Sequence, residues 1–250
     1  MVMLLNEFSN YIASLLETGR FRDYCPNGVQ VEGRPDIRRI ASGVTASQRL
    51  LEAATAWGAD AILVHHGYFW RNEDATVTGI KKRRIAHLLR HDISLLAYHL
   101  PLDAHPDLGN NAQLGKLLGF AQLGRFGDQD IACYGELAQP QALAQVTQHI
   151  TAQLQRAPLV IGDPRRPVSR VAWCTGAAQG HFEAAVALGV DAFLTGEISE
   201  QNVHMADETG VAFIAAGHHA TERYGIRALG EHVAGRFGLE HRFFDQDNPV

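Results

Sequence analysis

Short apolar runs and longer helical patterns alternate along this chain of 250 residues. The apolar runs are typical of buried strands, and the intervening segments place apolar side chains every three or four positions, as helices do. Strands are predicted over residues 29–31, 39–44, 61–64, 93–98, 131–137 and 158–161. Helices are predicted over residues 4–16, from a cap at Thr45 or Ser47 to Trp57, over 82–90, from Gly109 to Leu118, and over 141–154.

Part of this pattern occurs twice. Residues 58–66 can be laid on residues 189–197 at an offset of 131, and residues 95–99 on residues 214–218 at an offset of 119. Strands that alternate with helices favour parallel sheets. We therefore expect an α/β fold with two similar α/β lobes and mostly parallel sheets, the first over residues 1–128 and the second over 129–250. The stretch 129–162 is either a separate docking surface or part of the second lobe.

Composition narrows the function classes. Hydrophobic residues make up 46%, charged residues 20% and the net charge is −5, so nucleic acid is disfavoured as the main ligand, although a single nucleotide is not. Three widely spaced cysteines indicate neither a disulfide framework nor a thiolate zinc site. Without a signal-peptide pattern or an apolar run near the ~20 residues of a membrane span, we expect a cytoplasmic protein with no membrane partner.

Histidines and carboxylates follow the predicted strands. His65 and His66 come directly after the strand over 61–64, where the carboxyl edge of an α/β sheet binds ligands. His99 follows the next strand, and each lobe has a carboxylate four residues after such a histidine. If the two lobes face each other, one cleft collects side chains from both. They are His65, His66, Asp103, His218, His219 and Glu222.

This donor set is typical of a metal site. Imidazole with carboxylate suits zinc, iron, manganese, nickel or cobalt. The set is too large for one tetrahedral ion with an open position, and fits two ions ~3.5–4 Å apart that share a carboxylate. His218 and Glu222, four residues apart, lie on one face if a helix begins there.

Several neighbouring residues have more than one interpretation. His99 is a ligand, a hydrogen-bond partner of a ligand or a nucleotide contact, and the same holds for His105. Glu197 either reaches the cleft or caps the following helix. The aromatic run 68–70 is either core or a stacking wall for a flat base.

Five motifs, in order along the chain, resemble the dinuclear-metal family known as GTP cyclohydrolase I type 2, the Nif-three-like proteins, in its short bacterial branch. The motifs are His65-His66-Gly67, His99-Leu100-Pro101-Leu102-Asp103, Gly109-Asn110-Asn111, Thr195-Gly196-Glu197 and Gly217-His218-His219-Ala220-Thr221-Glu222-Arg223. The resemblance implies a homohexamer shaped as a hollow ring, or toroid, and two divalent metal ions per subunit, which are iron, zinc or manganese.

The resemblance also implies residue roles. The metal ligands would be His65, His66, Asp103, His218 and Glu222, with Glu222 as the bridge and the segment 211–225 completing the site. His99 and His219 would be catalytic neighbours that move protons.

The implied function is a dinuclear-metal-dependent hydrolase whose metal-bound hydroxide opens the imidazole ring of GTP or of a damaged purine nucleotide. No phosphate-binding loop of the GxxxxGK[ST] type is present, and nothing singles out Arg71, Lys81 or Arg223 for that task. Two alternatives stay open. One is a metal-dependent phosphoesterase, and the other is a metal-binding hexameric scaffold or adaptor without turnover.

Overall fold

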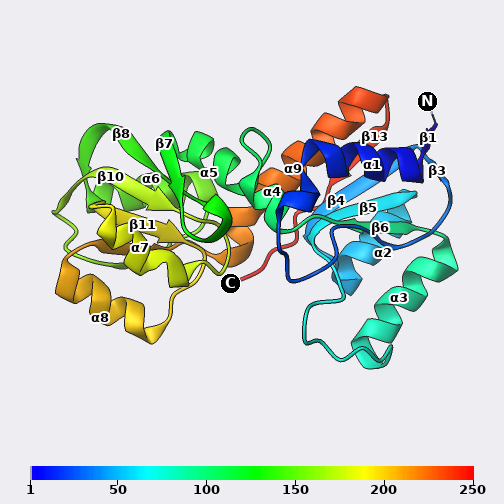
Figure 1. Cartoon of the computed structure of the whole chain (residues 1–250), viewed down its shortest axis with the longest axis horizontal. Helices are drawn as coiled ribbons and strands as arrows, with labels where there is room; N and C mark the ends of the chain where they lie inside the picture. The colour runs from blue at the N-terminus through cyan, green and yellow to red at the C-terminus, as the bar shows by residue number, and fades with distance from the viewer. Residues whose placement is uncertain (1) are drawn as a thin grey trace. The chain divides into compact units, whose positions relative to one another are not determined.

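The computed structural model describes residues 2–250, which form two compact units (Figure 1). The first unit holds the chain up to Gly109 and the segment Ile226–Asp247, and the second holds Asn110–Gly225 and Asn248–Val250. The sequence predicts a single boundary after residue 128. In the structure the chain passes from one unit to the other three times, after residues 109, 225 and 247.

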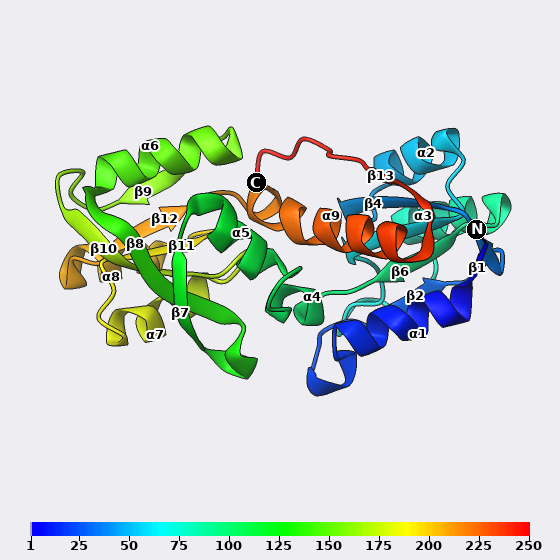
Figure 2. The same ribbon diagram turned by 90° about the horizontal axis from the view of Figure 1, so that it is seen from above.

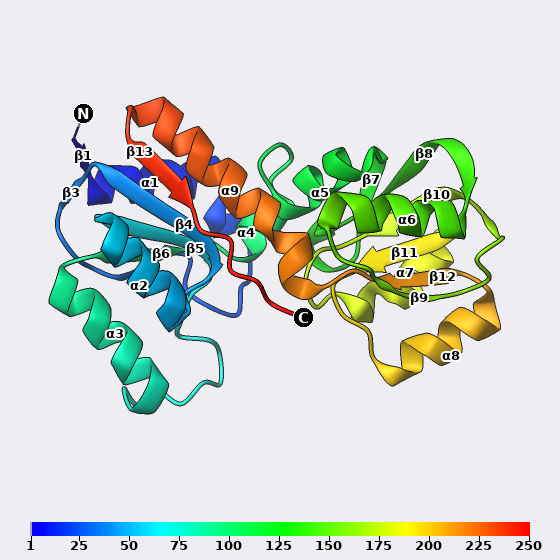
Figure 3. The same ribbon diagram turned by 180° about the vertical axis from the view of Figure 1, so that it is seen from behind.

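A five-stranded sheet in the order β13-β4-β5-β6-β2 forms the centre of the first unit. Its strands are β2 (Gly28–Val31), β4 (Arg39–Thr45), β5 (Ala61–His66), β6 (Ser94–Ala97) and β13 (Glu240–Phe243). All neighbours are parallel except β6 and β2. Figure 3 shows β13, from the end of the chain, lying beside β4. A separate two-stranded sheet pairs β1 (Met3–Leu4) with β3 (Asp36–Ile37).

Helices cover both faces of this sheet (Figures 1 and 2). They are α1 (Leu5–Leu15), α2 (Gln48–Trp57), α3 (Gly79–His91), α4 (Leu100–Ala104) and the later part of α9 (His218–Phe237). Because side chains alternate along a strand, Leu63 of β5 packs in one core with Phe8 of α1 and Leu229 of α9. Its neighbour Ile62 packs in the other core with Leu51 of α2 and with α3. The buried run of β5 is therefore covered on both faces, as its apolar sequence predicts.

The second unit contains a six-stranded sheet in the order β7-β8-β10-β11-β12-β9. Its strands are β7 (Ala121–Phe126), β8 (Ala132–Ala142), β9 (Leu159–Ile161), β10 (Pro167–Trp173), β11 (Ala192–Thr195) and β12 (Ala212–Ala215). The central trio β10-β11-β12 is parallel, and β7, β8 and β9 join it antiparallel. The mixed α/β class with two lobes is thus confirmed, and the parallel strands lie at the centre of each sheet.

Helices also flank the second sheet (Figure 2). They are α5 (Asn110–Leu118), α6 (Leu143–Leu154), α7 (Phe182–Ala187) and α8 (Glu200–Thr209), and short 3-10 turns lie at Thr18–Arg20, Asp128–Asp130 and Gln179–His181. Trp173 packs with α5 and α6 in one core. On the other side Phe182, Phe193 and Phe213 contact one another, with ring centroids 4.9–5.8 Å apart.

The internal repeat is visible in a pair of aspartates. Asp60 accepts hydrogen bonds at 2.8 and 3.0 Å from the backbone N–H groups of residues 38–39. Asp191 accepts the equivalent bonds, both 2.8 Å, from residues 169–170. Residues 38, 39 and 60 each lie 131 positions before residues 169, 170 and 191. The first predicted offset therefore corresponds to a local structure that both units share.

The second offset differs by one residue. Ser94 pairs with Ala61, and Ala212 pairs with Ala192 in the same way. The strand register therefore relates β6 to β12 at an offset of 118 rather than 119. His99 corresponds to Gly217 in this alignment, so the similarity of His99 to His218 is not one of structural position.

Among the described residues, none of the helices combines the length and apolar character needed to cross a bilayer.

Candidate metal centre

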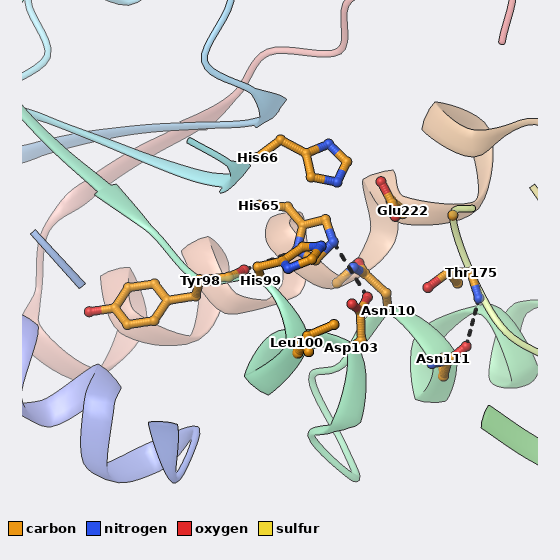
Figure 4. Close-up of polar contacts among 12 residues, drawn as sticks. His65, His66, Tyr98, His99, Leu100, Asp103, Asn110, Asn111, Thr175 and Glu222 are labelled. Carbon is orange, nitrogen blue, oxygen red and sulfur yellow. Dashed lines mark hydrogen bonds and ion pairs between the residues drawn. The ribbon is translucent and has the colours of Figure 1, made fainter. Parts of the chain in front are cut away.

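The central strand of the first unit ends in two histidines (Figure 4). The sequence predicts that this strand stops at Val64, but β5 continues to His66, which pairs with Thr45 of β4. The ring centroids of His65 and His66 lie 4.5 Å apart, and Nδ1 of His66 is 3.3 Å from Oγ1 of Thr45. The parallel sheet thus presents two imidazoles at its carboxyl edge, where α/β proteins bind ligands.

His65 is completely buried, and both of its ring nitrogens have oxygen neighbours. Nδ1 lies 2.9 Å from the carbonyl oxygen of Tyr98, which can only accept a hydrogen bond, so Nδ1 carries the hydrogen and Nε2 keeps its lone pair in the neutral ring. Nε2 lies 3.5 Å from Oδ1 of Asp103. His65 and Asp103 therefore direct a nitrogen and an oxygen donor at the same small volume.

Asp103 reaches this position because only Tyr98 and His99 separate β6 from α4. Pro101 stands in the first turn of α4, where its fixed φ suits a helix start and its missing N–H leaves no donor unsatisfied. The short helix is buried along its whole length, and Asp103 is only 7% exposed.

His99 precedes α4 and joins the two strand histidines. Its ring centroid lies 5.0 Å from that of His65 and 5.7 Å from that of His66. These three histidines each place one ring nitrogen within 4.8 Å of the others, a separation that a metal ion could bridge. Nδ1 of His99 lies 2.7 Å from Oδ1 of Asp23, a residue that no sequence motif singles out.

Burial would raise the pKa of the Asp23 carboxyl group, but hydrogen bonds and the electrostatic interaction with the His99 ring outweigh it and hold the pKa below its ordinary value. Cys25 offers a sulfur atom to the same pair. Burial and the nearby carboxylate of Asp23 raise the pKa of the Cys25 thiol to about 12. A thiol with that pKa remains protonated at neutral pH, so Cys25 is a weak donor by itself.

The aromatic run after the histidines divides between the two expected roles. Tyr68 is buried and its hydroxyl donates to the carbonyl oxygen of Ala46 at 2.9 Å, as expected for a core residue. Trp70 is half-buried and lies beside the histidines, its ring centroid 5.0 Å from that of His99 and 5.9 Å from that of His66. Trp70 is therefore the member of this run that can form a wall of the site.

The second unit carries a donor pair of its own at the start of α9. His218 and Glu222 lie one helical turn apart, with Nε2 of His218 3.1 Å from Oε1 of Glu222. Nδ1 of His218 lies 2.6 Å from Oε1 of Glu197. Glu197 therefore contacts a candidate ligand, while Ser199 takes the N-cap position of α8.

The two carboxylates change the protonation of His218. Burial lowers its pKa, but hydrogen bonds and charges from Glu222 and Glu197 outweigh burial and raise the pKa to about 9. In the absence of metal, His218 is thus an imidazolium at neutral pH, held between two carboxylates. A divalent cation satisfies the same carboxylates without that proton.

Two glycines leave room for this pair. Gly176 has φ +72°, and a Cβ there would collide with the Glu222 carboxylate. A Cβ at Gly196 would lie 2.6 Å from the Cα of His218. The loop after β11 therefore approaches the α9 backbone too closely for a side chain at Gly196, whereas a side chain at Gly176 would displace the Glu222 carboxylate.

The remaining motif residues have structural contacts in the second unit. Oδ1 of Asn111 accepts from the Thr175 backbone at 2.9 Å (Figure 4), and Oδ1 of Asn110 accepts from the Gly225 backbone at 3.1 Å. His219 is nearly buried, and its backbone N–H donates to the carbonyl oxygen of Val250 at 3.1 Å. Among residues 2–250, no cluster of possible metal ligands includes His219, so its predicted catalytic role stays a prediction.

The Duf34/NIF3 (NGG1p interacting factor 3) family matches residues 3–249. The chain belongs to this family. A DUF34/NIF3 relative from Neisseria meningitidis serogroup B, named GTP cyclohydrolase 1 type 2 homolog, is 56% identical over 249 residues and covers 100% of both chains. The resemblance predicted from the five motifs is thereby confirmed.

Solved structures of similar proteins share this fold. Protein ybgI, a structural-genomics target described as of unknown function, is 48% identical with a TM-score of 0.96, and the match covers 99% of this chain and 100% of ybgI. TTHA1606 from Thermus thermophilus is 32% identical with a TM-score of 0.91, and the match again covers 99% and 100%. The whole DUF34/NIF3 chain, with both α/β units, is therefore a shared architecture.

Proposed function

We propose that this DUF34/NIF3 protein holds two divalent metal ions and hydrolyses the imidazole ring of a purine nucleotide. In this proposal the donors of the two units act together. His65, His66 and Asp103 come from the first unit, and His218 and Glu222 come from the second.

The arrangement of the histidine rings carries the proposal. Four imidazoles have Nδ1 next to an oxygen atom, which leaves Nε2 for a ligand. The pairs are His65 with the Tyr98 carbonyl, His66 with Thr45, His99 with Asp23 and His218 with Glu197. Histidines that bind metals are held in this way, because an oxygen partner at one nitrogen fixes the ring and makes the other nitrogen more basic.

The donor set fits a pair of ions better than one. Three imidazoles and two carboxylates exceed what a single open tetrahedral site accepts, and Glu222 is the carboxylate that we propose as the bridge. Imidazole and carboxylate donors suit iron, zinc or manganese. When bound, such ions lower the pKa of a coordinated water and so supply a nucleophile at neutral pH.

The relatives' name directs the choice of substrate. Curated relatives are called GTP cyclohydrolase 1 type 2 homolog, which points to GTP, and a damaged purine nucleotide is the alternative that we propose. In this proposal, His99 and His219 move protons, and Trp70 stacks on the flat base.

Metal analysis and product detection test this proposal together. We expect protein purified without metal-affinity resin to contain two metal equivalents and to release formate from GTP in a metal-dependent way. Two metals without formate would contradict GTP as substrate and direct the search to damaged nucleotides and phosphate esters. Two metals without turnover of any of these would favour the metal-binding scaffold.

Glu222→Gln tests the bridge. We expect this variant to stay folded and to lose at least one metal equivalent, because an amide oxygen is a much poorer bridging ligand than a carboxylate. Glu208→Gln, an exposed position on α8, is the matched control and should keep both metals. Unchanged metal content in Glu222→Gln would contradict the bridging role.

We further propose that six subunits assemble into a ring, as the family resemblance implies. Light scattering coupled to size-exclusion chromatography would report six times the 27.4 kDa chain mass. A monomer or dimer across the working concentration range would contradict this assembly.

A further inference from the structure

Two residues of one loop hold His99. The His99 backbone N–H donates to Oδ1 of Asn27 at 2.8 Å, and its ring nitrogen Nδ1 lies 2.7 Å from Oδ1 of Asp23. One contact fixes the backbone and the other fixes the rotation of the ring. The loop over residues 23–27 thus determines both the position and the orientation of this imidazole.

The carboxylate of Asp23 is itself firmly held. Oδ2 accepts from Nδ2 of Asn27 at 2.8 Å and from the Leu100 backbone at 2.9 Å, while Oδ1 accepts from the Tyr24 backbone at 2.6 Å. The Asp23 side chain is only 4% exposed. These three partners can only donate, so Asp23 is an ionised acceptor, and Nδ1 of His99 must carry the hydrogen that it shares with Asp23.

The other nitrogen of His99 then belongs to the histidine cluster. Because Nδ1 faces Asp23, Nε2 is the nitrogen that remains for the cluster with His65 and His66. The Trp70 ring stands almost perpendicular to the His99 ring, at 87°, and covers part of it.

We propose that Asp23 is the positioning residue of His99. It keeps the imidazole in the Nδ1–H tautomer, so that Nε2 takes a proton from the attacking water and returns it to the ring nitrogen whose bond to C8 of the purine breaks. The water oxygen stays on C8 as the oxygen of a formamide, and hydrolysis of that formamide by a second water releases formate. Asp23 neither gains nor loses a proton. The catalytic part of this inference rests on the proposed function, whereas the tautomer does not.

Asp23→Asn should invert the tautomer. Both donors at Oδ2, the Asn27 amide and the Leu100 N–H, are fixed. At Oδ1 only the Tyr24 N–H is fixed, whereas His99 can change its tautomer. The asparagine oxygen will therefore occupy the Oδ2 side, and its amide nitrogen will face His99. The amide N–H then donates to Nδ1, and the hydrogen of the neutral ring moves to Nε2. Nε2 can no longer accept a proton, although the variant differs from the native chain only by a nearly isosteric group.

The ring nitrogen chemical shifts of ¹⁵N-histidine-labelled full-length protein, with and without zinc, report this change directly. Spectra are compared well above the ordinary imidazole pKa of about 6.5. We expect Nδ1–H for His99 in the native chain and Nε2–H in Asp23→Asn. In metal-loaded protein we expect kcat for the purine nucleotide to fall about 10–100-fold, with unchanged metal content and a KM within twofold of native.

Asp60→Asn is the matched control. Asp60 is also a buried carboxylate, but its partners are the Arg34 side chain and the backbone of residues 38–39. We expect this variant to keep the native His99 tautomer and kcat.

Three results would overturn the inference. The first is an Nε2–H tautomer in the native chain, a measurement that needs no variant to fold. The others are an unchanged tautomer in folded Asp23→Asn, and an unchanged kcat in that variant. A native protein that turns over no purine nucleotide would instead refute the proposed function, and the tautomer would still decide whether Asp23 positions His99.

Discussion

Oxygen partners on the far side of the histidine rings decide what the candidate site can bind. The sequence shows which residues can be ligands, because His65, His66 and Asp103 belong to short motifs at predicted strand ends. It does not show Asp23, which lies 76 residues from His99, and it leaves Glu197 with two interpretations. Such partners are brought together by the tertiary fold, and a loop residue without periodicity gives no signal of that contact.

Gly176→Ala tests how closely the loop after β10 must approach Glu222. We expect a loss of stability of about 1–3 kcal/mol, because a left-handed φ is strained for alanine, together with weaker metal binding from the collision with the carboxylate. Thermal unfolding and metal analysis measure the two effects.

Gly119→Ala separates strain from collision. Gly119 has φ +70°, nearly the same as Gly176, but a Cβ there meets nothing within 4 Å. This control should lose about 1–2 kcal/mol of stability and keep its metal. Equal metal content in the two variants would show that the space at Gly176 is not needed for binding.

The sequence predicts a helix or strand well where its apolar residues follow a clear periodicity, and poorly where they do not. The strand over 61–64 and the helix ending at Trp57 were predicted because burial on one or both faces leaves a clear periodicity. β13 was missed because Glu240–Phe243 alternates exposed and half-buried positions and contains three polar residues. It becomes a strand by pairing with β4, some two hundred residues earlier, and local sequence contains no trace of that partner. β7, an edge strand with half of its residues exposed, was missed for the same reason.

His241 of β13 should make stability depend on pH. Nε2 of His241 lies 2.7 Å from the Ser42 hydroxyl. Burial lowers its pKa, Glu231 partly offsets this and Arg227 adds to it. The folded chain therefore keeps His241 neutral where the unfolded chain binds a proton, so this histidine favours unfolding as pH falls below about 6.5.

We expect His241→Gln to lose less stability than the native chain between about pH 6.5 and pH 5. Denaturant unfolding at a series of pH values measures this slope. Some slope should remain, because burial also lowers the pKa of His87 and His181. His149→Gln, at an exposed position, is the control. An identical slope in His241→Gln and the native chain would contradict the assignment.

The hydrophobic cores, and not a single point along the sequence, divide the chain into its two units. α5 precedes the boundary that the sequence suggested after residue 128, yet Leu114 and Leu118 pack with α6 and the second sheet. The indole N–H of Trp173 also donates to the Asn111 carbonyl at 2.9 Å. α5 therefore belongs to the core of the second unit. The order of elements along the sequence does not show to which unit α5 belongs.

Two fragments test this division. We expect residues 110–225 expressed alone to unfold cooperatively and to keep their single tryptophan, Trp173, buried. Residues 129–225 lack α5 and β7, and we expect red-shifted tryptophan fluorescence and no cooperative transition. Fluorescence during urea unfolding measures both. Equally cooperative unfolding of the shorter fragment would show that α5 is dispensable to this core.

The matched bonds of Asp60 and Asp191 have an evolutionary consequence. Two aspartates that bind equivalent backbone groups at one fixed offset are what tandem duplication of an ancestral gene leaves behind. At that offset His66 corresponds to Glu197, so one half has an imidazole where the other has a carboxylate. The two halves thus share a scaffold but differ in chemistry. A substitution in one half is therefore not expected to have the same effect as the equivalent substitution in the other half.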